Sequence, residues 1–182
     1  MIICIDSQVI IWGIKKQPTK GQEEMVSKAE YFFEWVDNNN HEIIIPTIVV
    51  AEILAPEPET IRAKYLEALS KAFIIVNFDV RAALKYAQLL NGRFNEVKKL
   101  QEETGTIRQK MKADHMIIAT AMVNNASCIY SYDGGLIKFA EGFIDVKEFP
   151  SPPATQPDLF SIPPSSSQKR EEDTQTDFGK LK

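Results

Sequence analysis

The sequence predicts an α/β fold, a three-layer α/β/α sandwich with a mostly parallel central sheet of about five strands. Short apolar segments rich in β-branched residues alternate along the chain with amphipathic helical patterns. The first four of these segments lack polar alternation, which is typical of strands that helices cover on both faces. Because strand, helix and strand follow one another repeatedly, right-handed crossovers and a parallel sheet are expected.

Five segments are expected to form the strands of this sheet. They are residues 2–5, 41–46, 73–76, 126–131 and 143–147. The first and the fourth contain the two cysteines of the chain, Cys4 and Cys128, within apolar runs that show no metal-ligand spacing. This placement predicts reduced core residues of a cytosolic protein.

Helical patterns occupy the stretches between these segments. Apolar residues recur at three-to-four-residue spacing over 25–36 and over 80–100, which predicts two amphipathic helices. Further helices are expected over residues 47–54, 58–72 and about 112–124. Trp12, Tyr31 and Trp35 have apolar neighbours, so they are expected in the core or at a dimer interface rather than as platforms for nucleic-acid bases.

Length and composition predict one folded domain followed by a tail. With 182 residues and 44% hydrophobic content, the chain has enough material for one core. After Pro150 the composition changes to proline, serine and charged residues, which cannot bury enough apolar surface to offset their ordering entropy. We therefore expect a domain over residues 1–150 and a disordered tail over 151–182.

Charge and hydropathy argue against two classes: proteins that attract polyanions over their whole surface, and proteins that span a membrane. With a net charge of −4 the molecule as a whole does not attract polyanions, so any contact with nucleic acid must be local. No apolar run approaches the roughly 18 residues of a membrane span. The start M-I-I-C-I-D lacks the basic region of a signal peptide. We expect a soluble cytoplasmic protein that makes no membrane contact.

Two acids follow strands of the predicted sheet at the point where each strand ends. Asp6 comes directly after the first segment, and Asp133 follows the fourth. The carboxyl ends of parallel strands meet at one edge, where open α/β sheets place their ligands, so these acids converge if the two strands are neighbours. Capping of the following helix is the alternative explanation for either acid alone.

Two further acids lie on predicted helices. Glu52 ends the apolar run I-P-T-I-V-V-A-E, and Asp114 begins the most apolar helix, in K-A-D-H-M-I-I-A-T-A. Clustered carboxylates raise one another's pKa unless a cation neutralises them. Ligands that are all oxygen favour Mg²⁺ or Mn²⁺, which can activate water and support phosphodiester hydrolysis. Taken singly each acid is better explained by capping or surface placement, but the joint placement reverses that preference.

Four motifs together resemble those of PIN-domain proteins, including the VapC-type ribonuclease toxins. They are D-S-Q-V, I-P-T-I-V-V-A-E, K-A-D-H-M-I-I-A-T-A and S-Y-D-G-G-L-I-K-F, in matching order and spacing over residues 1–149. The resemblance implies a PIN-like fold. It also implies that the catalytic, metal-binding residues are Asp6, Glu52, Asp114 and Asp133, and that Ser7 and Ser131 support them by hydrogen bonds. Gln8, where the family more often has Asn, and the proline-rich tail depart from the pattern.

Polar and basic residues precede the third acid. Thr106, Arg108, Lys110 and Lys112 either contact substrate phosphates or belong to an ordinary solvated loop, and the sequence leaves both interpretations open. His115 is interpreted as a structural residue rather than a proton-transfer group.

The leading functional hypothesis is a metal-dependent endoribonuclease that hydrolyses RNA phosphodiester bonds, as the toxin of a toxin–antitoxin pair. The resemblance also implies a cognate antitoxin and a homodimer. A second hypothesis rests on the tail motif Q-P-D-L-F. Its residues Gln156, Leu159 and Phe160 match the Q-x-x-L-F peptides that bind sliding clamps. Under this hypothesis the clamp recruits the nuclease to DNA replication or repair. The third is an inactive PIN binding module, against which the presence of all four acids counts.

Overall fold

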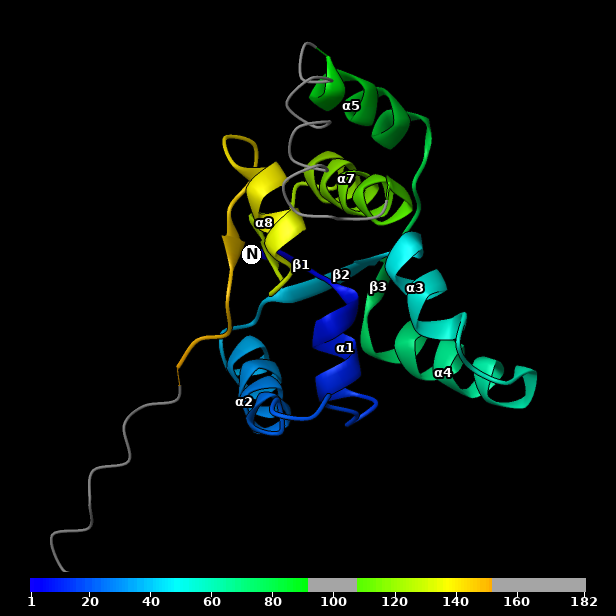
Figure 1. The fold of residues 1–182 in the computed structure, drawn as a ribbon. Coiled ribbons are helices and arrows are strands. Elements are labelled where there is room, and N and C mark those ends of the chain that lie inside the picture. Colours follow the sequence, from blue (N-terminus) through cyan, green and yellow to red (C-terminus); the bar gives the residue numbers. More distant parts are fainter. Residues whose placement is uncertain (92–107, 152–182) are drawn as a thin grey trace, which may run out of the picture. The chain divides into compact units, whose positions relative to one another are not determined.

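The computed structural model describes residues 1–91 and 108–151, which contain a five-stranded sheet with helices on both faces (Figure 1). The strands are β1 (Ile2–Ile5), β2 (Glu42–Pro46), β3 (Ile74–Val76), β4 (Cys128–Tyr130) and β5 (Val146–Lys147). They lie in the order β3-β2-β1-β4-β5, and all four pairings are parallel. The predicted α/β class with a parallel sheet is thereby confirmed.

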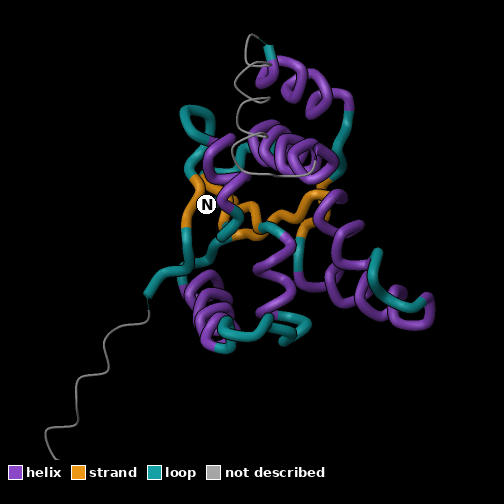
Figure 2. The backbone as a smooth tube through the Cα atoms, in the orientation of Figure 1, coloured by secondary structure: helices purple, strands orange, loops and turns teal. Residues whose placement is uncertain are grey.

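Seven helices connect these strands within the described ranges. They are α1 (Ser7–Gly13), α2 (Glu24–Asn38), α3 (Thr47–Leu54), α4 (Glu59–Ala72), α5 (Val80–Leu90), α7 (Arg108–Val123) and α8 (Gly134–Ala140). Figure 2 shows the strands between α1 and α2 on one side and α7 and α8 on the other. None of the described helices is both long and apolar enough to cross a membrane.

The strand order creates a switch point between β1 and β4. From β1 the chain proceeds through α1 and α2 to β2 and then to β3, moving away from β1 in one direction. After β3 it returns through α5 and α7 to β4 on the other side of β1. The segments that follow β1 and β4 leave the sheet toward opposite faces, and open α/β sheets place their ligands beyond the carboxyl ends of the strands at such a point.

Apolar side chains of the central strands fill the core on both faces of the sheet. Ile3, Cys4 and Ile5 in β1 and Cys128 and Ile129 in β4 have no exposed surface, as the unbroken apolar runs predict. Both cysteines are free thiols. Burial of these strands between two helical layers supplies the main driving force for folding, because apolar surface removed from water stabilises the native state.

An aromatic cluster closes one side of this core. Trp12 lies edge-on to Tyr132 with ring centroids 5.3 Å apart, and Phe32 stacks on Phe149 at 5.0 Å. Trp12 is buried, as its apolar neighbours predict, whereas Trp35 is half-buried against the same cluster. These rings pack in the protein interior, which agrees with a structural role for Trp12.

Four elements call for comment against the expectation. The short helices α1 and α8 are not predicted by the apolar pattern, because their buried residues do not extend over enough turns to show a helical period. The edge strand β3 exposes half of Ile74, so it is not covered on both faces. Helix α5 ends at Leu90, and the rest of the helix predicted over 80–100 lies outside the described residues.

Candidate active site

Asp6 and Asp133 lie beside one another because β1 and β4 are hydrogen-bonded neighbours. The Asp6 amide donates to the carbonyl of Tyr130 at 3.1 Å, which continues the β1–β4 ladder to the start of α1. Both acids also cap helices. Asp6 accepts a hydrogen bond from the Ser7 amide at 2.7 Å, and Asp133 accepts from the amides of Gly135 at 2.8 Å and Leu136 at 3.2 Å. Capping and convergence at the switch point therefore occur together.

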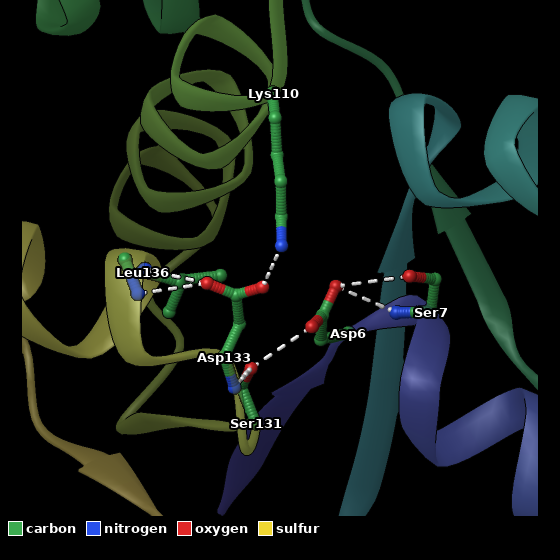
Figure 3. Close-up of polar contacts among 7 residues, drawn as sticks. Asp6, Ser7, Lys110, Ser131, Asp133 and Leu136 are labelled. Atoms are coloured by element: carbon green, nitrogen blue, oxygen red, sulfur yellow. Dashed lines mark hydrogen bonds and ion pairs between the residues drawn. The ribbon is translucent and has the colours of Figure 1, made fainter. Parts of the chain in front are cut away.

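Ser131 links the two strand ends (Figure 3). Its hydroxyl donates to Asp6 Oδ2 at 2.9 Å and accepts from the Asp133 amide at 3.0 Å, and the residue is fully buried. On the other side of Asp6, the Ser7 hydroxyl is 3.4 Å from Oδ1. Both oxygens of this buried carboxylate thus have hydrogen-bond donors from the protein, which holds Asp6 in one orientation.

Asp114 approaches the pair from α7. It is buried and lies near Gly135, where an added Cβ would be 3.1 Å from Asp133 Oδ1 and 3.4 Å from Asp114 Oδ2. The small residue at position 135 therefore allows the carboxyl groups of Asp114 and Asp133 to border the same point of the α8 backbone. A side chain at this position would compete with them for space.

Glu52 reaches the cluster from α3. Burial raises the pKa of the Glu52 carboxyl and a hydrogen bond from the Ser7 side chain opposes this rise, so the carboxyl lies close to the start of α1. Lys15, which follows α1, has an almost fully buried side chain. Its ammonium donates to the carbonyl of Ile53 in α3 at 3.5 Å and forms an ion pair with Glu57, just after α3. The ion pair holds the helix that carries Glu52 beside the helix that carries Ser7.

Burial and mutual repulsion raise the pKa of three of the acids. Burial, followed by the charges of Asp133 and Asp6, raises the Asp114 pKa to about 7. Burial also raises the Asp6 pKa, although hydrogen bonds from Ser131 and Ser7 oppose the change. Glu52 is exposed as a whole residue, but loss of solvent around its carboxyl and the charge of Asp6 raise its pKa. The four acids therefore act on one another electrostatically.

The pKa of Asp133 differs from that of the other three acids because the ammonium group of Lys110 contacts Asp133. Burial raises its pKa, but the hydrogen bond from Lys110 and those from the Leu136 and Gly135 amides outweigh this effect and hold the pKa below its ordinary value. Lys110 Nζ lies 2.5 Å from Asp133 Oδ2. The cluster is thus partly neutralised by a side chain of its own.

The donor set fits a hard divalent cation. The four carboxylates offer only oxygen ligands, which Mg²⁺ and Mn²⁺ prefer, and burial and mutual repulsion raise the pKa of three of them. Among the described residues, however, no three acidic, histidine or cysteine side chains are arranged to hold an ion as they stand. That all four acids share one cation therefore stays a prediction.

The residues predicted to contact substrate do not all lie at the carboxylate cluster. Lys110 points into the cluster, whereas Lys112 is exposed two residues further along α7, at about 200° around the helix axis from Lys110. Helix α7 begins at Arg108, and Thr106 lies outside the described residues. His115 is buried, with its ring stacked on Phe139 at 3.4 Å between centroids, which agrees with a structural role.

Two further polar features of the site bear on the sequence interpretation. The Gly135 and Leu136 amides donate to Asp133, so the helix capping that the sequence offered as an alternative explanation of this acid occurs at the start of α8. Gln8 Oε1 is buried and has no hydrogen-bond partner in the described part of the chain, and the structure offers no physical reason for this. The tail residues Gln156, Leu159 and Phe160 lie outside the described ranges.

Comparison with solved structures identifies similar folds. VapBC2 from Rickettsia felis, solved bound to a DNA fragment from their promoter, has a TM-score of 0.54 and 19% sequence identity, and the match covers 82% of this chain and 100% of that chain. VapBC-1 from nontypeable Haemophilus influenzae has a TM-score of 0.56 and 16% identity, with coverage of 81% and 98%. At these identities the likeness concerns the fold alone.

The sequence matches a protein family but no curated protein. A family profile described as the PIN domain matches residues 3–142, a range that includes all four acids and the switch point between β1 and β4. Fold and sequence agree, and the chain belongs to the PIN-domain family.

Proposed function

We propose that this protein is a metal-dependent endoribonuclease, the toxin of a toxin–antitoxin pair. The observation that carries the proposal is the convergence of Asp6, Glu52, Asp114 and Asp133 at the carboxyl ends of β1 and β4, with an Asp114 pKa raised to about 7. Such a cluster is destabilising for the fold unless a cation is bound, so a binding role explains why it is present. Membership of the PIN-domain family supports nuclease chemistry.

The four acids would hold Mg²⁺ or Mn²⁺ in this proposal. A bound divalent ion supplies an activated water and stabilises charge on the phosphate. The protein's own contribution is orientation: Ser131 and Ser7 hold Asp6, and the amides of Gly135 and Leu136 hold Asp133. Preorganised ligands of this kind reduce the cost of ordering when an ion binds.

An antitoxin partner is supported by the two similar structures, which are both VapBC proteins. RNA as the substrate and a homodimer come from the sequence resemblance, and a cytoplasmic location comes from the apolar placement of Cys4 and Cys128 and from the hydropathy; all three remain proposals. A protein with net negative charge and a carboxylate site needs a positively charged group near that site to bind a phosphate backbone. Lys110 supplies such a group at the rim of the cluster.

Substitution of two site acids tests the proposal. In Asp6→Asn, Asp114→Asn, cleavage of an RNA oligonucleotide should be lost, and Mn²⁺ should no longer raise the Tm, because a ligand stabilises only the state that binds it. Asp37→Asn, an exposed acid at the end of α2, is the control and should keep both properties. Full cleavage by the double variant would overturn the assigned site.

The tail motif Q-P-D-L-F favours a second candidate function, in which the same nuclease is recruited to DNA replication or repair by a sliding clamp. Titration of a peptide covering residues 151–165 against purified clamp distinguishes the two, since the toxin proposal needs no such binding. An inactive binding module would instead retain partner binding and show no metal-dependent cleavage.

A further inference from the structure

Lys110 brings a positive charge to the carboxylate cluster. Its ammonium lies 2.5 Å from Asp133 Oδ2 (Figure 3), and its charge opposes the rise that burial and the neighbouring acids cause in the pKa of Asp114 and of Glu52. Lys110 and Asp114 are four residues apart on α7, so both project from the same face of the helix. Helix α7 thus carries Asp114, one acid of the cluster, and Lys110, the basic residue whose charge neutralises Asp133.

The geometry makes this ion pair exchangeable. The Lys110 side chain is 56% exposed, whereas that of Asp133 is 12% exposed, so the lysine reaches inward from the rim and its long stem can turn back to solvent. The contacted oxygen, Oδ2, is the one that the α8 amides leave available, because those amides bond to Oδ1. A cation that used Oδ2 would therefore meet the ammonium at the same atom.

We propose that Lys110 is an exchangeable counter-ion of the site, which neutralises Asp133 when no divalent ion is bound and turns to a substrate phosphate when one is. This inference rests on the proposed metal site and adds a coupling to it. Because the ammonium and the divalent ion compete for Asp133, Lys110 weakens metal binding to the free protein. A phosphate that holds the ammonium away removes this competition, so metal and RNA should bind cooperatively.

A metal titration of the full-length protein tests the competition. Lys110→Met should bind Mn²⁺ roughly two- to fivefold more tightly than the wild type, a fold-change that corresponds to a half-exposed ion pair. Lys110→Arg, which keeps the charge, should remain close to the wild type. Lys138→Met removes an exposed charge from the last turn of α8 and is the matched control, with unchanged Mn²⁺ affinity. Calorimetry and the Mn²⁺ dependence of the Tm provide the readouts.

Binding of RNA tests the coupling. Ca²⁺, which also takes oxygen ligands, should tighten binding of a labelled RNA oligonucleotide by the wild type several-fold relative to EDTA, and the gain should be smaller in Lys110→Met. If Mn²⁺ binds the wild type and Lys110→Met equally, or binds the variant more weakly, the counter-ion role is wrong and the metal site stands. If Mn²⁺ binds neither protein, both the counter-ion role and the proposed metal site are wrong.

Discussion

Asp114 combines burial with two negative neighbours, which gives it a pKa of about 7 in the folded protein against 3.8 for an unperturbed aspartate. The folded protein therefore holds a proton on Asp114 over a range in which the unfolded chain has released it. Such a group contributes stability below about pH 4 that is progressively lost as the pH rises to about 7. Native Asp114 is a source of instability at neutral pH when metal is absent.

Asp114→Asn should reveal this pH dependence. In EDTA at pH 8 the variant should be more stable than the wild type by roughly 2 kcal/mol, because it removes a buried charge, whereas near pH 4 the two should be similar. Urea unfolding at the two pH values measures the difference. Asp37→Asn should shift stability by less than about 0.5 kcal/mol at either pH. An equal effect of Asp114→Asn at pH 4 and pH 8 would contradict the raised pKa.

At the level of residues, the sequence predicts that Asp6 and Asp133 lie at one edge of the sheet but not all of the contacts that they make there. Asp6 and Asp133 are predictable because each follows an apolar strand, and strand ends meet at one edge of a parallel sheet. The contact between Lys110 and Asp133 is not predictable, because it depends on the rotational position of α7 over α8, which tertiary packing determines. For the same reason the sequence gives no means of separating Lys110 from Lys112.

The element that positions Asp133 is the start of α8. Gly134 and Gly135 occupy the first turn, where backbone amides donate to the acid that precedes them. The two glycines differ in their surroundings: an added Cβ at Gly134 meets nothing within 4 Å, whereas one at Gly135 lies 3.1 Å from Asp133 Oδ1. This difference provides an internal comparison within one helical turn.

Gly135→Ala should therefore weaken metal binding while preserving the fold. The new methyl group must displace the carboxyl of Asp133 by a few tenths of an ångström, so the Mn²⁺-induced rise in Tm should shrink by about half or more. Gly134→Ala should keep the full metal response and be neutral or stabilising by up to about 1 kcal/mol, because it restricts the unfolded chain. Equal metal responses of the two variants would show that the first turn of α8 does not position the site.

At this scale, predictability follows the length of each element. The long helices α2, α4 and α7 show a clear period or apolar run, and their existence agrees with the prediction. Helices α1 and α8 have only seven residues each, too few to show a period, and both begin at an acid that the sequence also explains as a ligand. The edge position of β3 cannot be predicted from composition, since strand order is a property of the whole sheet.

In the molecule as a whole, the last described residue that belongs to the core is Phe149. Its ring packs on Phe32 and Tyr132, and its amide donates to the Tyr132 hydroxyl at 2.9 Å. The four site acids all precede it. The C-terminal end of the folded domain should therefore lie close to Pro150, as composition predicts.

Two truncations test this boundary. A chain that ends at Pro150 should keep cooperative unfolding, the Mn²⁺ response and cleavage of naked RNA. A chain that ends at Glu148 loses the Phe149 ring and should be destabilised by roughly 3 kcal/mol, the cost of removing a buried aromatic side chain. Thermal unfolding of both proteins measures the difference. Loss of cooperative unfolding in the longer chain would show that residues 151–182 contribute to the core.

The central position of β1 has a consequence for how the protein is made. Asp6 is synthesised well before its ladder partner Tyr130 and before its buried hydrogen-bond donor Ser131, which lies 125 residues later in the chain. At roughly 5–20 residues per second, the ribosome needs about 6–25 s to bridge that interval. Until then the nascent chain carries Asp6 without the strand that completes the site, so translation products that stop before β4 lack the assembled carboxylate cluster.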